Sequence, residues 1–200
     1  MKISLVISPV ILALYIILLF IILLVVIKAA NELFIQYQNA KLNNVSYGYQ
    51  EVFKDTTNAV ELMARLHIEM ANFVNDLKIK YPKNDGINRL AIGFNRLKIE
   101  EAPNEDDSTS YTVNKGDLMA LCLREKNGDH PFHNYNTLQF VIIHEMAHIM
   151  SISEGHNDEF VTNFQFLLRD AHKLGYYQPV DYRSNPITYC GLRVTNNPFF

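Results

Sequence analysis

The chain has 200 residues, with 18 lysines and arginines against 21 aspartates and glutamates, and a net charge of −3 at pH 7. This length suits one sizeable folded domain and is too short for two full domains plus a membrane span. Outside residues 1–28, 16 basic and 21 acidic residues remain, a net charge of −5. These residues form no lysine or arginine stripe, so no nucleic-acid partner is expected.

Residues 4–27 carry no charge and consist almost entirely of leucine, isoleucine and valine. About twenty such residues cross a bilayer as a helix, whereas the apolar core of a signal peptide has roughly 7–15. We therefore predict a single-pass transmembrane anchor at residues 1–28. The pair Ala29-Ala30 leaves signal-peptide cleavage as the alternative. Lysines flank both ends of the run, so charge does not determine which side of the membrane the domain faces.

Residues 29–55 mix asparagine, glutamine, tyrosine and charge with little apolar periodicity, which predicts a juxtamembrane spacer. Apolar side chains then recur every three or four residues between Val60 and Leu77, which predicts an amphipathic helix ending before Pro82. Residues 56–200 are accordingly expected to form the folded domain. The glycosylation sequon at Asn44 is usable only where the domain faces a secretory lumen.

The middle of the chain predicts short strands. Residues 87–99 fit either a strand or a short helix, and residues 100–110 are an acidic loop. Residues 111–113 and 118–123 read as two strands around a tight turn, which predicts a β-hairpin. As a sheet edge, the first of these strands could pair with an extended peptide; a plain core strand fits the pattern equally well.

Two helices are predicted in the C-terminal half. Asn136 is a suitable N-cap for a helix over residues 137–151, which is apolar on nearly all sides and should be central and buried. A second helix begins at Asp158 and ends near Gly175. Residues 178–200 should wrap over the domain and bury Tyr189 and Cys190. The fold class expected from these elements is α+β.

The first of these helices carries His144-Glu145-Met146-Ala147-His148. Positions i and i+4 share one face of a helix, so both imidazoles can provide half of a tetrahedral zinc site. The adjacent glutamate can then activate a water molecule as a general base. Gly155 permits a turn that brings His156 back as the third ligand. Carboxylates remain alternatives for that third position: Glu154, Asp158 and Glu159.

The remaining histidines and cysteines are given structural roles. His67 lies near the apolar face of its helix and should be packed or hydrogen-bonded there. His130 and His133 lie in a loop and should be exposed to solvent. Cys122 and Cys190 could pair in an oxidising compartment, but two buried thiols are the favoured interpretation.

The motif from His144 to His148, followed by Gly155-His156 and by Phe160, resembles the WLM and SprT-like zincin metallopeptidases. The resemblance covers roughly residues 111–174 and implies a zincin-like domain. It further implies one Zn²⁺ ion bound by His144, His148 and His156, Glu145 as the general base, and a peptide or protein substrate. Asn157 departs from the family pattern, in which glycine is usual.

Residues 111–124 and 180–198 are also similar to uncharacterised, membrane-anchored zincin-like proteins of large DNA viruses. The WLM and SprT-like enzymes are soluble and act at DNA, whereas this chain is acidic and has a predicted anchor. A role in DNA repair is therefore not carried over from the resemblance.

These features predict a membrane-anchored zinc metallopeptidase. The main alternative is a membrane-tethered structural protein, for example of a virion, that keeps zinc for stability and cleaves nothing. A zinc hydrolase of non-peptide amides is a third possibility. Four tyrosines could stabilise the oxyanion, and the sequence does not rank them: Tyr176, Tyr177, Tyr182 and Tyr189.

Overall fold

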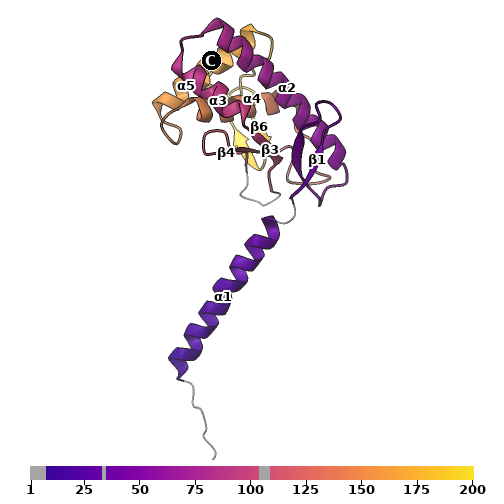
Figure 1. The fold of residues 1–200 in the computed structure, drawn as a ribbon, viewed down its shortest axis with the longest axis vertical. Helices are drawn as coiled ribbons and strands as arrows, with labels where there is room; N and C mark the ends of the chain where they lie inside the picture. The colour runs from indigo at the N-terminus through magenta and orange to yellow at the C-terminus, as the bar shows by residue number, and fades with distance from the viewer. Residues whose placement is uncertain (1–7, 33–34, 104–108) are drawn as a thin grey trace, which may run out of the picture.

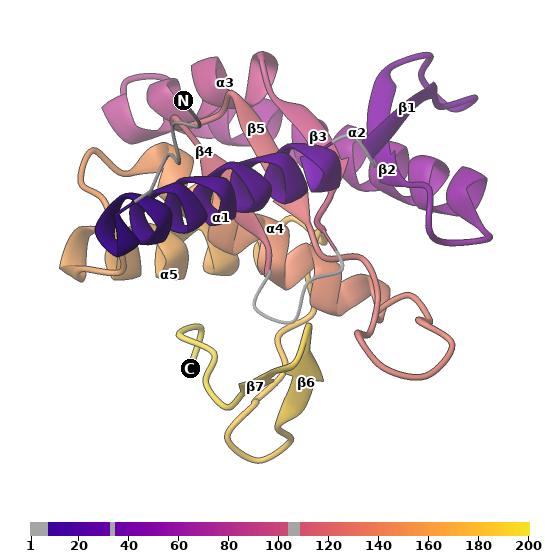
Figure 2. The same ribbon diagram turned by 90° about the horizontal axis from the view of Figure 1, so that it is seen from below.

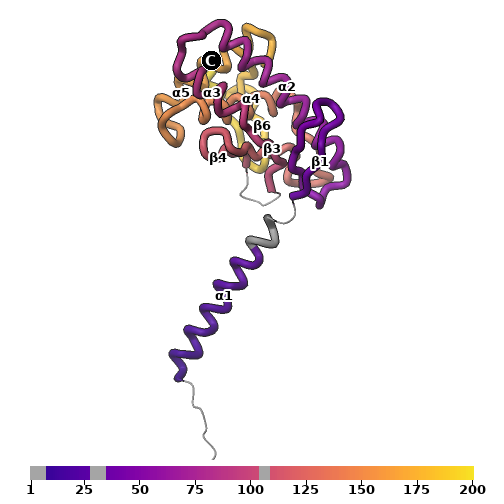
Figure 3. The backbone as a smooth tube through the Cα atoms, viewed as in Figure 1, coloured from indigo at the N-terminus to yellow at the C-terminus, as the bar shows by residue number. Residues whose placement is uncertain are grey.

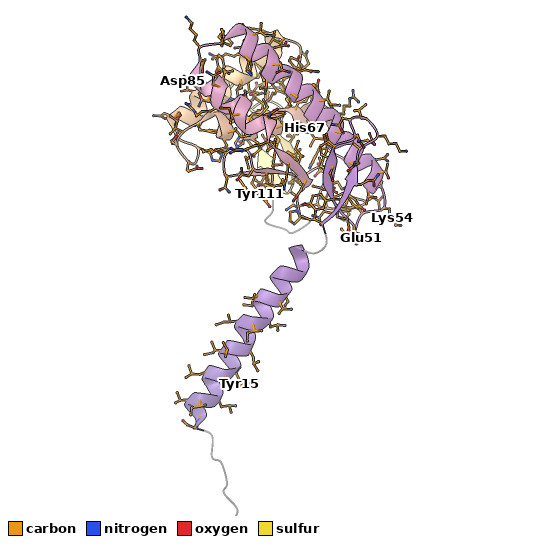
Figure 4. All side chains as sticks on the ribbon, viewed as in Figure 1. Tyr15, Glu51, Lys54, His67, Asp85 and Tyr111 are labelled. Carbon is orange, nitrogen blue, oxygen red and sulfur yellow. A yellow bond between two sulfur atoms is a disulfide. The ribbon has the colours of Figure 1, made fainter. Side chains whose placement is uncertain are left out.

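The computed structural model describes residues 8–32, 35–103 and 109–200. Helix α1 (Pro9–Glu32) projects away from the rest of the molecule as a rod (Figure 1). Side chains stand out from it on all sides (Figure 4), and none of the stretch Pro9–Ile27 is buried. By length and composition this helix could cross a membrane, and a signal sequence would look the same. The first seven residues of the predicted anchor lie outside the described residues.

A five-stranded sheet has the strand order β1-β2-β3-β5-β4. Strand β3 pairs in parallel with both β2 and β5, whereas β1–β2 and β4–β5 are antiparallel hairpins. The predicted hairpin that begins at residue 111 is therefore confirmed, and β4 is an edge strand. The strands are β1 (Ile35–Asn39), β2 (Ser46–Gln50), β3 (Lys98–Glu101), β4 (Tyr111–Val113) and β5 (Leu118–Leu121).

Helices pack against one another in chain order, so that α4 lies between α3 and α5. In the tube of Figure 3, α3, α4 and α5 lie farther from α1 than β3 and β4 do. Helix α4 is buried over most of its length, as its apolar composition predicts. The architecture is α+β, as expected. The helices are α2 (Thr56–Lys80), α3 (Asp85–Asn95), α4 (Tyr135–Met150) and α5 (Asp158–Lys173).

The structure differs from the prediction of a spacer at residues 29–55. Helix α1 continues to Glu32, and the hairpin β1–β2 then joins the sheet. Strand β1 shows no apolar repeat because it is an edge strand that exposes most of its side chains. Tyr47 in β2 is fully buried and its hydroxyl lies 2.9 Å from Nδ1 of His67, so the hairpin is packed into the domain.

Residues 87–99, which the sequence left open, contain both kinds of element. Helix α3 ends at Asn95, and β3 begins at Lys98. Helix α4 starts at Tyr135, two residues before the predicted position. The prediction of Asn136 as the N-cap is wrong, because the side chain of Asn134 accepts the backbone N–H of Asn136 at 2.9 Å and occupies that position.

The turn between β4 and β5 contacts α3 where Gly116 of the turn meets Gly93 of the helix. A Cβ on Gly116 would lie 2.6 Å from the carbonyl oxygen of Gly93, and the φ of Gly116 is +112°. We expect Gly116→Ala to lower the free energy of unfolding by about 2 kcal/mol or more, because steric overlap adds to backbone strain. Urea denaturation would measure this loss.

Gly128→Ala is the matched control for that measurement. Gly128 also has a positive φ, of +66°, but nothing lies within 4 Å of the place of its Cβ. It therefore reports the conformational penalty alone. Equal losses for the two variants would contradict a steric role for the contact between Gly93 and Gly116.

The C-terminal segment forms a small separate hairpin, β6 (Ile187–Tyr189) and β7 (Leu192–Val194). In Figure 2 it lies on the opposite side of α4 from α3. Tyr189 and Cys190 are buried, as predicted. The preference for two free thiols is wrong, because Cys190 forms a disulfide with Cys122, which lies 68 residues away in the sequence. The hairpin brings Cys190 over the end of β5, and the two Cα atoms are 6.3 Å apart.

Candidate metal centre

Three imidazoles converge at the middle of α4 and the loop that follows it. The Nε2 atom of His144 lies 3.3 Å from that of His148 and 3.0 Å from that of His156, and the last two are 3.2 Å apart. A tetrahedral zinc site with Zn–N distances of 2.0–2.1 Å places its nitrogens about 3.3 Å from one another. The spacing of the three nitrogens therefore fits a single zinc ion.

The loop between α4 and α5 is held from several sides, which positions His156. Gly155 has a φ of +78°, a conformation that favours glycine. Lys115, from the turn between β4 and β5, donates a hydrogen bond to the carbonyl of Ser153 at 2.8 Å and lies 3.2 Å from Glu154. Asn157 caps α5 by accepting the N–H of Phe160, so this departure from the family pattern has a role in the fold.

Two of the three carboxylates that compete for the third ligand position are otherwise engaged. Glu159 accepts the backbone N–H groups of Ile152 and Ser153 at 2.8 and 2.9 Å. The hydroxyl of Ser153 also donates to Glu159. This hydrogen bond, together with the two from the backbone, lowers the pKa of Glu159 to about 2. Glu154 points to Lys115 instead. Asp158 lies in the first turn of α5, and His156 is the residue that joins His144 and His148 within one cluster.

Glu145 lies beside this cluster and is 3% exposed. Burial raises its pKa to about 7, although the hydroxyl of Thr112 donates to its Oε2 at 2.8 Å and opposes that rise. Thr112 lies in β4, so the edge strand directly orients the glutamate. No role for Thr112 was predicted from the sequence. The alternation of side chains along β4 could have indicated one, because it places Thr112 on the opposite face of the strand from Tyr111 and Val113.

His144 and His148 are suited to bind a metal as neutral ligands. Burial, with the neighbouring imidazoles, lowers the pKa of His144 to about 3, and burial with His156 lowers that of His148 to about 4. Both rings are therefore uncharged at neutral pH. Phe160 contacts all three rings, with centroid distances of 4.8, 4.3 and 4.7 Å to His144, His148 and His156. This packing gives the aromatic residue of the motif a physical role.

A cleft of about 570 Å³ opens over the cluster. One wall is the segment from Thr109 to Lys115, which includes β4, and the other is formed by α4 and the loop that carries His156. A cavity of similar volume lies between α2 and α3, beside His67, and contains none of the three clustered histidines. The cleft over the cluster is therefore the candidate active site.

Of the four tyrosines considered as oxyanion donors, only Tyr189 lines a cavity at the cluster. Its hydroxyl donates to the carbonyl of Cys122 at 2.9 Å and lies 2.6 Å from the hydroxyl of Ser110. Tyr176 donates to Asp76 on α2 instead, and Asn197 donates to the hydroxyl of Tyr177.

The other histidines lie away from the cluster. His67 is packed against Phe94 and hydrogen-bonded to Tyr47, as predicted. The prediction that His133 is exposed is wrong: it is buried, with Nε2 3.4 Å from the sulfur of Cys190. His130 is half-buried against the carbonyl of Glu125. The burial of His133 arises because its ring packs against Tyr189 and lies beside the disulfide.

Comparison with known families identifies the domain. The model of the WLM domain family matches residues 96–197, just over half of the chain. The chain belongs to the WLM domain family. This match includes β4, α4, α5 and the C-terminal hairpin, so every residue of the cluster lies inside the WLM domain.

Relatives of this WLM domain occur in large DNA viruses. An uncharacterized protein of Acanthamoeba polyphaga mimivirus is 37% identical over 102 residues, which are 49% of this chain and 51% of that protein. One from Invertebrate iridescent virus 3 is 43% identical over 86 residues, 43% of this chain and 50% of that protein. One from Invertebrate iridescent virus 6 is 29% identical over 157 residues, 74% of this chain and 86% of that protein. The chain thus spans about half the length of the first two relatives. The predicted similarity to viral proteins is confirmed.

Among solved structures, the crystal structure of Wss1 from Saccharomyces cerevisiae is similar over 64% of this chain and 89% of that chain. The sequence identity is 16% and the TM-score is 0.45. The family assignment depends on the WLM match, and not on this structural likeness.

Proposed function

We propose that this WLM domain is a zinc-dependent peptidase that α1 anchors to a membrane. His144, His148 and His156 would hold one Zn²⁺ ion and leave the fourth tetrahedral position for water or substrate. When bound, zinc polarises the scissile carbonyl and makes water more acidic. The observation that carries the proposal is the buried Glu145 beside three convergent imidazoles, at a cleft bordered by an edge strand.

Glu145 acts as the general base in this proposal. It takes a proton from the attacking water and passes it to the leaving amine. Burial raises the pKa of Glu145, which favours a carboxylate that can accept a proton and then return it. The hydrogen bond from Thr112 to Oε2 fixes the carboxylate and leaves its other oxygen for the proton transfer.

Strand β4 gives the substrate a place to bind. It lies at the edge of the described sheet and lines the same cleft as the histidines. An extended peptide that pairs with such an edge gains main-chain hydrogen bonds with little dependence on its sequence. It would then pass over His144 and Glu145. This arrangement favours a peptide substrate over a small non-peptide amide.

A structural zinc protein at a membrane is the alternative function. It would need the three histidines, but it would gain nothing from a buried carboxylate beside them, because burying an acid costs free energy. The open cleft and the hydrogen bond from Thr112 to Glu145 favour the peptidase. The net charge of −5 outside residues 1–28 still argues against a nucleic-acid partner.

The metal content of the purified full chain tests the zinc site. We expect about one zinc per chain by elemental analysis, and less than a tenth of that in His144→Ala, because the metal depends on its neutral imidazole ligands. His172→Ala, at an exposed histidine outside the cluster, should keep its zinc. A well-folded wild-type protein that binds no zinc under these conditions would contradict the proposal.

A further inference from the structure

A second cavity, of about 420 Å³, adjoins the cleft over the histidines. It shares His144, Glu145 and His156 with the cleft, so the two spaces meet at the cluster. We call this second space the apolar cavity. Its other walls come from α4, α5 and the C-terminal hairpin and include Phe140, Val141, Phe160, Val161, Phe164 and Leu192.

The floor of the apolar cavity is aromatic and closely packed. The ring of Phe164 packs against Phe140 at 5.3 Å and against Phe160 at 5.7 Å, and all three side chains are buried. Phe164 also contacts His144 edge-on at 5.1 Å. The apolar floor therefore reaches the first histidine of the cluster, and with it the point where a scissile bond would lie.

The rim of the apolar cavity consists of aliphatic residues that the folded chain leaves uncovered. Val161 on α5 is 38% exposed and Leu192 on β7 is 57% exposed. Apart from Tyr189, the titratable residues that line the cavity are His144, Glu145 and His156. The proposed metal site already uses these three. A charged side chain that entered would lose its hydration without finding a counter-charge there. An apolar side chain would gain free energy from burial.

We propose that the apolar cavity binds a large apolar side chain (leucine, methionine or phenylalanine) of a substrate residue that flanks the scissile bond. This inference depends on the proposed peptidase function and specifies its substrate class. A peptide paired with β4 projects alternate side chains to opposite sides. The residue at the cleavage point lies over His144 and Glu145, which belong to both spaces, so its side chain can enter the apolar cavity.

Two substitutions at the rim test the cavity without disturbing the fold, because both positions are exposed. Val161→Trp fills the cavity from α5, and Leu192→Lys places a positive charge at its mouth. Thr162→Trp is the matched control, because Thr162 is the next residue on α5, is exposed and does not line the cavity. Circular dichroism of each variant checks that the helices are retained.

The first readout is cleavage of a peptide library by the zinc-loaded full chain in detergent micelles, with fragments identified by mass spectrometry. One flanking position should prefer leucine or phenylalanine over alanine by about tenfold or more, a typical discrimination for an apolar pocket. Val161→Trp should reduce this ratio at least tenfold, and Thr162→Trp should leave it unchanged. Leu192→Lys should increase cleavage beside aspartate and glutamate. Cleavage that depends on Glu145 but shows no apolar preference would overturn the inference and leave the peptidase proposal standing.

The second readout is binding, which does not require activity. We would compare benzyl- and methyl-substituted hydroxamates, which chelate zinc, by calorimetry on the zinc-loaded chain. Tighter binding of the benzyl compound, lost in Val161→Trp and kept in Thr162→Trp, supports the apolar cavity even where no peptide is cleaved. Equal binding of the two compounds overturns it. A chain that binds neither zinc nor hydroxamate overturns both the inference and the proposed function.

Discussion

Replacing Glu145 with glutamine is expected to lower the rate of peptide hydrolysis about 10²–10⁴-fold without releasing zinc. An amide cannot take the proton from the attacking water, so the general-base contribution is lost. The three imidazoles are unchanged, and the glutamine carbonyl can still accept the hydrogen bond from Thr112. Library cleavage at pH 7 measures the rate, and elemental analysis of the same sample measures the zinc.

Glu51→Gln is the control for this prediction, because it makes the same chemical change at an exposed residue just after β2 (Figure 4). It should keep the wild-type rate. The decisive contrary result is a Glu145→Gln protein that retains zinc and cleaves as fast as the wild type. That result would contradict the role of Glu145 as the general base. A wild-type protein that binds zinc and cleaves no peptide would instead favour the structural alternative, in which zinc stabilises the domain.

Removing the disulfide should produce the largest loss of stability. The bond between Cys122 and Cys190 closes a loop of 68 residues. In the chain-entropy model a loop of that length contributes about 4 kcal/mol, because it restricts the unfolded chain. The double variant Cys122→Ser, Cys190→Ser should lose about this amount. It should also loosen the β6–β7 hairpin, whose Leu192 forms part of the apolar cavity.

Urea denaturation with and without a thiol reductant separates these effects. The reductant should lower the stability of the wild-type protein towards that of the double variant and should leave the double variant unchanged. Alkylation and mass spectrometry of the native protein give an independent check. Two free thiols per native chain would contradict the disulfide and restore the interpretation drawn from the sequence.

Helices α4 and α5 and the clustered histidines could be predicted because their signals are local. Apolar periodicity locates a helix, and the spacing of His144 and His148 follows from one turn of that helix. The return of His156 needed only a short loop with a glycine. The assignment of these three residues as zinc ligands, with Glu145 as base, stays a prediction until metal and activity are measured.

The features that could not be predicted depend on contacts between distant parts of the chain. Nothing near Cys122 indicates that Cys190 lies beside it, and the burial of His133 follows from that same contact. Strand β1 has no periodic signal because its environment at the sheet edge is mostly solvent. The cap of α4 was misplaced by two residues because two asparagines offer equivalent side chains and only the backbone conformation selects between them.

With α1 as a membrane anchor, the short connection between α1 and β1 would restrict where this domain works. Glu32 ends the helix and Ile35 begins the sheet, so three peptide units, about 10 Å when extended, separate them. With α1 in a bilayer, the domain would rest almost on the lipid headgroups. Tyr111, the first residue of β4, lies on the side of the domain nearest α1 (Figure 4). Such a geometry would select cleavage sites by their height above the membrane, favouring the juxtamembrane segments of neighbouring membrane proteins over freely diffusing ones.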